Sequence, residues 1–185
     1  MLEKIKKEIN TLPENFVVLT IVPYDKSEEV NLGILKFLIN EKKNKGSYIA
    51  VNKPYQSITE ILGKNKIDSD QLFFIDCMTK KAGGNTKDIT NCSFIDTPSN
   101  LTSLGIELEK LFKKAEHNFV FLDSLNMLVQ YNNKKQIIQF AHSLLSKVRI
   151  NNIKGIVVGL HEETDEDLIA ELSQLCDKVL DFRGD

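Results

Sequence analysis

Apolar residues in this chain occur in two kinds of pattern. Short continuous apolar runs are typical of strands buried on both faces, and longer stretches with an apolar residue at every third or fourth position predict amphipathic helices. Strands are predicted at residues 16–22, 47–51, 72–76, 93–96, 119–123, 155–160 and 178–182. Helices are predicted at about residues 1–12, 27–43, 54–62, 100–115, 134–148 and 166–176. Ser99 is expected to cap the fourth of these helices, and Gly63 to end the third.

Strands that alternate with helices of this length predict a parallel sheet covered on both faces. We therefore expect the α/β class, as a three-layer α/β/α sandwich with a mostly parallel central sheet. No repeat or linker divides the sequence, so residues 1–185 are interpreted as a single domain. Residues 78–91 contain two adjacent glycines and few apolar residues, which predicts a flexible loop.

The stretch Phe119–Ser124 carries the clearest chemical signal. Four bulky apolar residues run directly into Asp123 and Ser124. In an open α/β sheet, ligands bind at the carboxyl ends of the strands. An acid at the end of a buried strand is therefore a candidate ligand-binding residue. Asp76 ends another predicted strand, Asn52 and His161 follow two more, and all three are expected at the same edge.

Composition excludes several classes of function. The formal charge of −2 and the pI of about 6.0 give no overall attraction to nucleic acid or to anionic membranes. Basic pairs such as Lys80-Lys81 are scattered and lack interleaved aromatic residues, so no nucleic-acid-binding surface is indicated. Of the 24 basic residues, only Arg149 and Arg183 are arginines, which argues against bidentate phosphate recognition.

The remaining composition indicates a cytoplasmic protein. Three cysteines without CxxC spacing are interpreted as reduced thiols and do not suggest a metal cluster. The first residues are rich in lysine and glutamate, unlike a signal peptide. No apolar run approaches the roughly 18 residues that a membrane-spanning helix needs.

The order of these parts resembles the RecA/KaiC-like branch of the P-loop ATPases. Residues 12–19 resemble the turn and first strand that precede the family's phosphate loop, and residues 48–51 resemble its second strand. Phe119–Ser124 resembles the Walker B strand, and residues 155–160 and 177–182 resemble the later strands. The resemblance implies a RecA-like P-loop NTPase core. It also implies that Asp123, with Ser124, would hold Mg²⁺ and that the ligand would be ATP.

The chain departs from that family at the phosphate loop. The family pattern is Gly-x-x-x-x-Gly-Lys-[Ser/Thr], whose backbone amides and lysine surround the phosphates. Residues 23–31 contain no glycine. Aligning the apolar helix places Val30 and Asn31 at the lysine and hydroxyl positions, whereas aligning Lys26 and Ser27 there shifts the helix by about one turn.

Acidic residues occupy the region where a phosphate would bind. Glu28 and Glu29 fall in the first helical turn, and Asp25 or Ser27 is expected to cap the helix, with capping-box spacing from Asp25 to Glu28. We expect these side chains to satisfy the free amides at the helix start and to repel a triphosphate.

Two further departures concern catalysis. In the family the second strand usually ends in a glutamate that activates water, but here Val51 is followed by Asn52 and Lys53, neither of which is a suitable base. Ring-forming relatives also carry a basic hairpin beyond the last strand, where this sequence offers only Arg183. We therefore expect no catalytic residues.

These features favour a RecA/KaiC-like pseudo-ATPase domain without a cofactor, acting as a regulatory or protein-interaction module through a protein partner or self-association. An alternative is an atypical Mg-nucleotide-binding ATPase or switch, in which Lys26, Ser27, Asp123 and Ser124 bind ATP and Mg²⁺ weakly. A more distant alternative is a metal-dependent hydrolase that uses Asp76, Asp123 and His161.

Overall fold

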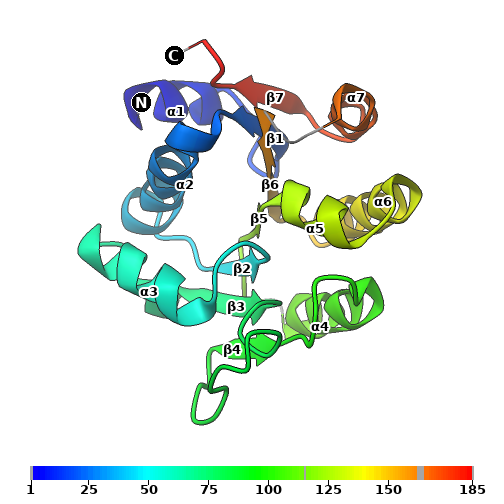
Figure 1. Ribbon diagram of the computed structural model, residues 1–185. Helices are drawn as coiled ribbons and strands as arrows, with labels where there is room; N and C mark the ends of the chain where they lie inside the picture. Colours follow the sequence, from blue (N-terminus) through cyan, green and yellow to red (C-terminus); the bar gives the residue numbers. More distant parts are fainter. Residues whose placement is uncertain (1, 115, 162–164, 185) are drawn as a thin grey trace.

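A computed structural model of the chain describes residues 2–114, 116–161 and 165–184. These residues form a seven-stranded sheet in the order β4-β3-β2-β5-β6-β1-β7, and every strand pairing is parallel. Helices α1, α2 and α3 lie on one side of the sheet, and α4, α5, α6 and α7 lie on the other (Figure 1). The predicted three-layer α/β/α architecture is confirmed.

The strands lie close to their predicted positions. Their bounds are β1 Val17–Val22, β2 Gly46–Ala50, β3 Leu72–Asp76, β4 Cys92–Phe94, β5 Phe119–Asp123, β6 Lys154–Leu160 and β7 Lys178–Asp181. The agreement follows from burial on both faces, because nearly every residue of a central parallel strand is then apolar.

The helices also follow the apolar periodicity. Their bounds are α1 Leu2–Asn10, α2 Ser27–Lys36, α3 Tyr55–Lys64, α4 Leu101–Lys114, α5 Leu125–Tyr131, α6 Lys134–Ile150 and α7 Glu166–Ser173. Short 3₁₀ turns span Tyr24–Lys26 and Ser69–Gln71, and a π-helical segment, Phe37–Glu41, extends α2. Within the described part of the chain, no helix has both the length and the apolar character needed to cross a membrane.

Three local predictions were wrong. Helix α5 was not predicted. It follows β5 directly, and its buried Asn126 exchanges two hydrogen bonds with the backbone of Leu160 on β6. Asn100 rather than Ser99 caps α4, since the Asn100 side chain accepts a hydrogen bond from the amide of Ser103 (3.0 Å). Gly63 lies inside α3, which ends one residue later.

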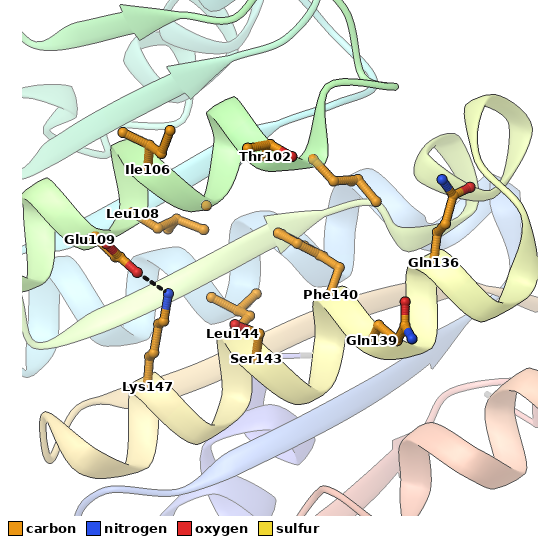
Figure 2. Close-up of a pocket in the computed structure, with 12 residues that line it drawn as sticks. Thr102, Ile106, Leu108, Glu109, Gln136, Gln139, Phe140, Ser143, Leu144 and Lys147 are labelled. Atoms are coloured by element: carbon orange, nitrogen blue, oxygen red, sulfur yellow. Dashed lines mark hydrogen bonds and ion pairs between the residues drawn. The ribbon is translucent and has the colours of Figure 1, made fainter.

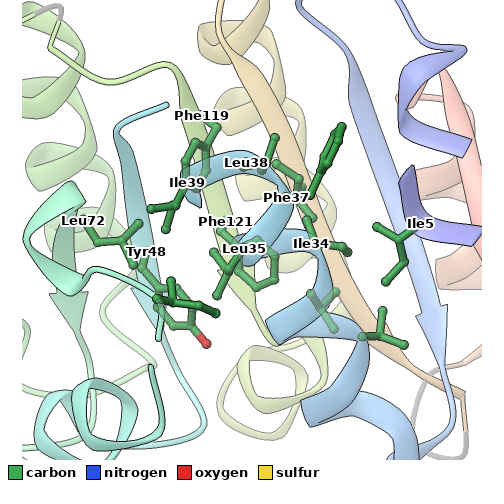
Figure 3. Close-up of a cluster of buried hydrophobic side chains, with 14 of the residues drawn as sticks. Ile5, Ile34, Leu35, Phe37, Leu38, Ile39, Tyr48, Leu72, Phe119 and Phe121 are labelled. Atoms are coloured by element: carbon green, nitrogen blue, oxygen red, sulfur yellow. The ribbon is translucent and has the colours of Figure 1, made fainter. Parts of the chain in front are cut away.

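Strand β5 occupies the middle of the sheet, and its alternating side chains enter two separate cores. Phe119 and Phe121 face α2 and α3, while Val120 and Leu122 face α4 and α6. Figure 3 shows the first core, where Phe119 and Phe121 lie among apolar side chains of α2. Asp123 has the parity of the two phenylalanines, so the strand delivers its carboxyl group to the α2–α3 side of the sheet.

The predicted flexible loop at residues 78–91 begins with a compact turn. The amide of Gly84 donates to the carbonyl oxygen of Thr79 (2.9 Å), and Gly83 has a positive φ of 71°. Later in the loop, the Asn91 side chain accepts a hydrogen bond from the Tyr55 hydroxyl of α3 (2.9 Å). At the start of the loop, the amide of Met78 donates to Asp76 of β3 (2.6 Å), so the segment is joined to the sheet at its start and to α3 at its end.

The first residue pair between β2 and β5, Gly46 with Phe119, requires a glycine. A Cβ on Gly46 would lie 2.2 Å from the ring of Phe119, which is fully buried. We predict that Gly46→Ala lowers the free energy of unfolding by about 1–3 kcal/mol, because the fully buried ring must shift within the core to make room for the Cβ. Urea unfolding followed by circular dichroism measures the change.

Gly63→Ala is the matched control. A Cβ at this exposed position of α3 meets no atom within 4 Å. Because alanine favours a helix over glycine by up to about 1 kcal/mol, this variant is expected to be as stable as the natural chain or more stable. Equal destabilisation by both substitutions would contradict the role of the Phe119 contact.

Candidate functional site

A cavity of about 240 Å³ lies at the carboxyl edge of the sheet, between α2 and α3. Asp123 from β5 and Tyr48 from β2 contribute to its inner wall. Three of the candidate ligand-binding residues predicted from the sequence line this cavity, namely Ser27, Asn52 and Asp123. The other lining residues are Tyr24, Asp25, Glu28, Asn31, Leu32, Leu35, Tyr48, Lys53, Ile58, Ile61 and Leu62.

The Asp123 carboxylate is held by neighbouring side chains. It is 9% exposed, and one of its oxygens accepts a hydrogen bond from the Tyr48 hydroxyl. Asn31 of α2 also hydrogen-bonds to it. The Tyr48 ring stacks on Phe121 at a centroid distance of 5.3 Å and packs against Phe74 at 5.7 Å. These aromatic neighbours fix the ring, so its hydroxyl reaches diagonally along the strand pair to the acid.

Burial also changes the acidity of this pair. The pKa of Asp123 is raised mainly by desolvation, although the hydrogen bond from Tyr48 and the positive charge of Lys53 oppose that effect. The pKa of Tyr48 is raised well above its ordinary value by burial and by the adjacent Asp123 charge. The tyrosine therefore remains a hydrogen-bond donor throughout the physiological pH range.

The connection from β1 to α2 is short and lacks a wide loop. Only Pro23, which has no amide hydrogen, separates β1 from the 3₁₀ turn Tyr24–Lys26, and α2 begins at Ser27. The Ser27 hydroxyl donates to the carbonyl oxygen of Tyr24 (2.9 Å). Ser27 lines the cavity and the neighbouring Lys26 does not.

The expected acidic cap of α2 was wrong. Neither the 3₁₀ turn nor α2 has a side-chain cap hydrogen bond, because the helical path already begins at Tyr24, before both predicted cap residues. Glu28 instead forms an ion pair with Lys53 across the cavity mouth, with Nζ 2.7 Å from Oε2. Asp25 also lines the cavity. Asp25 and Glu28 therefore line the cavity and do not cap the helix.

The remaining candidate residues do not join this group. Ser124 is fully buried, does not line the cavity, and follows a cis peptide bond from Asp123. The carboxylate of Asp76 accepts hydrogen bonds from the amides of Tyr55 (2.7 Å), Met78 (2.6 Å) and Thr79 (2.8 Å), and from the Thr79 hydroxyl. Its role here is to join α3 and the following loop to β3.

The geometry does not assemble the Asp76, Asp123 and His161 constellation. Ala50 of β2 pairs with both Asp76 and Asp123, so these acids are two strand spacings apart, about 10 Å. His161 lies on the exposed surface after β6. Over the described residues, no group of three histidine, cysteine or acidic side chains is arranged to hold a metal ion.

A larger groove of about 470 Å³ lies on the opposite side of the sheet, between α4 and α6. Figure 2 shows apolar and neutral polar side chains along it, with Glu109 of α4 paired to Lys147 of α6 at one end. These two charges satisfy each other. The groove therefore offers apolar surface but little chemistry, and the cavity between α2 and α3 is the stronger candidate.

Comparison with known proteins identifies the family. A profile described as "Family of unknown function (DUF7504)" matches residues 53–182. The chain belongs to this family. The DUF7504 match includes Lys53, α3 and Asp123, whereas the α2 wall of the cavity and Tyr48 precede it. No curated protein matches the chain.

Two solved structures resemble this DUF7504 member. The KaiC-like protein PH0186 from the hyperthermophilic archaeon Pyrococcus horikoshii OT3 has a TM-score of 0.65 and 10% identity, over 92% of this chain and 72% of that one. PH0321, an uncharacterized Pyrococcus horikoshii protein in complex with an unknown peptide, has a TM-score of 0.72 and 14% identity, over 97% and 82%. At these identities the comparison establishes the fold, and the predicted RecA/KaiC-like fold is confirmed.

Sequence reasoning did not anticipate the roles of Tyr48 and Asn31. Tyr48 was part of the second predicted strand, where a buried tyrosine is usual and its hydroxyl partner cannot be inferred from periodicity. Asn31 gave a usable signal, since it is a polar residue in a helix that is apolar on nearly all sides. A polar side chain buried on such a helix requires a partner, and here that partner is Asp123.

The raised pKa of Asp123 predicts a specific pH dependence. The folded chain binds this proton more tightly than the unfolded chain, so stability falls as pH rises from the ordinary carboxyl pKa of 3.8 through the raised folded pKa. Asparagine does not ionise. The free energy of unfolding of Asp123→Asn should therefore rise relative to the natural chain, by up to about 1.4 kcal/mol per pH unit within that window. Urea unfolding at a series of pH values measures it.

Asp165→Asn is the control with the opposite sign. Asp165 caps α7, and its pKa is lowered mainly by the hydrogen bond from the Leu168 amide. Its contribution to stability is present above the ordinary carboxyl pKa, so this variant should lose stability relative to the natural chain as pH rises. A flat difference for Asp123→Asn between pH 4 and pH 7 would show that burial does not control its ionisation.

Proposed function

We propose that this chain is a RecA/KaiC-like domain that does not hydrolyse ATP and acts as a regulatory or protein-interaction module. The observation that carries the proposal is the environment of Asp123, whose carboxylate is covered by the Tyr48 hydroxyl and by Asn31. A magnesium site needs open carboxylate oxygens, together with phosphate oxygens and water. An acid whose oxygens are used by its own neighbours is poorly suited to that role.

The β1–α2 connection supports the same proposal. Triphosphates bind where several backbone amides at a helix start point into a loop. Here the connection is Pro23 followed by a 3₁₀ turn, and the adjoining cavity has three carboxyl groups, from Asp25, Glu28 and Asp123, against the one ammonium group of Lys53. These residues do not fit a bound magnesium triphosphate.

Similarity adds a second line of support. The relative PH0321 is in complex with an unknown peptide. By this likeness we propose that the present chain also acts through contact with a polypeptide rather than through turnover of a nucleotide. The residue after β2 agrees with that proposal, since Asn52, two residues beyond the strand, is not a base that could activate water.

The competing proposal is a weak Mg-nucleotide site. It is favoured by one observation, that Ser27 and Asp123 line the same cavity. Against it stand the acidic lining and the position of Lys26 outside the cavity. The two proposals predict different responses to ATP.

We predict that millimolar Mg-ATP does not raise the melting temperature. A ligand at a hundred times its dissociation constant adds about 2.7 kcal/mol of stability, which in a domain of this size corresponds to a shift of roughly 5–10 °C. Differential scanning fluorimetry measures the shift, with magnesium alone and ATP alone as controls. A rise with Mg-ATP that Asp123→Asn abolishes, or phosphate release above that of the same variant, would favour the nucleotide site.

A further inference from the structure

The cavity between α2 and α3 combines an aliphatic wall with a concentration of acceptors. The wall is made by Leu32, Leu35, Ile58, Ile61 and Leu62. Acidic side chains outnumber basic ones around it, because Asp25, Glu28 and Asp123 face a single lysine, Lys53. An aliphatic stem ending in a positive charge complements both features, as long basic side chains do when they bury their methylene groups and keep the charged end near polar partners.

A second observation points to a donor-rich ligand. Asn31 lines the cavity and is only 8% exposed, and its Oδ1 has no hydrogen-bond partner among the described residues. A buried acceptor without a donor is unfavourable, so such atoms in folded proteins usually have a partner. Asn52, half-buried at the end of β2, adds another side-chain carbonyl to the same lining. Several acceptors spread over one cavity suit a guanidinium group, which carries five N–H donors in a plane.

The rim of the cavity carries an aromatic side chain. Tyr24 lines the cavity and is 65% exposed, which is unusual for a large aromatic residue. A guanidinium group stacks favourably on such a ring and interacts with its negative face. The ring thus adds an attraction for a planar cation at the entrance.

Lys53 shows that a cation is accommodated at this position. Its ammonium lies 2.7 Å from the Glu28 carboxylate, and its charge partly opposes the rise that burial causes in the pKa of Asp123. The side chains of Lys53 and Glu28 are 40% and 54% exposed, and ion pairs this exposed to water are weak. An incoming cation can therefore displace Lys53 from Glu28.

The size of the cavity indicates a single side chain. Sites for small organic ligands usually occupy roughly 300–1,000 Å³, and this cavity has about 240 Å³. Resting on the proposed role in protein contact, we infer that this cavity binds an arginine side chain from a partner protein, with its stem along the aliphatic wall and its guanidinium group among Glu28, Asp25 and Asn31.

An NMR titration tests the assignment. The probe is a blocked Gly-Arg-Gly peptide, and its neutral counterpart carries citrulline in place of arginine. The arginine peptide should give saturable shifts of the amides of Glu28, Asn31 and Lys53, with a dissociation constant on the order of 1 mM. The citrulline peptide should give none at the same concentrations.

Two variants should change the affinity in opposite directions. Glu28→Gln removes a charged acceptor and should weaken binding about tenfold. Lys53→Met removes the competing ammonium and should strengthen binding several-fold. Glu29→Gln is the matched control, because Glu29 is exposed one residue away and does not line the cavity. All three positions are partly or fully exposed, and unchanged spectra away from the cavity establish that each variant is folded.

Several outcomes would overturn the inference: no saturable shift, equal binding of the citrulline peptide, or equal weakening by Glu28→Gln and Glu29→Gln. A lysine peptide that binds as tightly would remove the preference for a guanidinium group. Free arginine that binds as tightly would indicate a small-molecule ligand instead of a protein segment. Mg-ATP is titrated in parallel. Binding of Mg-ATP would refute the proposed function, whereas the absence of shifts with both Mg-ATP and the arginine peptide would refute only the arginine site.

Discussion

The arrangement of the candidate site depends on one hydrogen bond, from the Tyr48 hydroxyl to the Asp123 carboxylate. Removing a carboxylate from water is costly unless protein donors replace the lost hydration. Asp123 stands at the end of the middle strand, where water is largely excluded, and Tyr48 and Asn31 supply those donors. The bond joins β2 to β5, and the Asn31 contact brings α2 to the same point. Apolar packing of Val30, Ile34 and Leu35 holds α2 against the sheet, and the contact with this buried acid adds a polar link at the cavity wall.

Asp76 shows the same principle at a second strand end. Its two oxygens accept hydrogen bonds from the start of α3 and from the turn that follows β3. Two acids at the edge where α/β proteins usually bind ligands are thus engaged by the chain itself. The carboxylate oxygens that remain open to a ligand are those of Asp25 and Glu28, which also line the cavity. This division is the basis of the proposal that the cavity accepts a cation and not a phosphate.

Much of the fold could be predicted from the sequence because the sheet is buried on both faces. Each strand is then a short apolar run, and each helix shows a stripe of apolar residues. Helix α5 escaped prediction because its seven residues directly follow the apolar β5 and are too short to show a period of their own. The start of α2 at Ser27 was predicted correctly, but its side-chain cap was not. Acidic residues near a helix start favour capping, whereas here the 3₁₀ turn Tyr24–Lys26 leads directly into α2.

The site was harder to predict than the fold. Asp123 could be found because an acid ends an apolar run, and Asn52 and Ser27 because they flank predicted elements. The partnership of Asp123 with Tyr48 joins residues 75 positions apart and depends on the strand order, which the chain sequence does not reveal. The ion pair between Glu28 and Lys53 likewise depends on α2 lying next to the segment that follows β2, which the sequence does not reveal.

The π-helical segment Phe37–Glu41 has a consequence for comparing this chain with others. Its wider turn places Phe37, Leu38 and Ile39 all in the core, where an α-helix of 3.6 residues per turn would direct one of three successive side chains outward. Positions in α2 counted backwards from beyond Glu41 are therefore out of phase by one residue with those of an uninterrupted α-helix. A homologue that lacks the extra residue would present a different side chain to Asp123 under an ungapped alignment, and a one-residue gap within the segment restores the equivalence of Asn31.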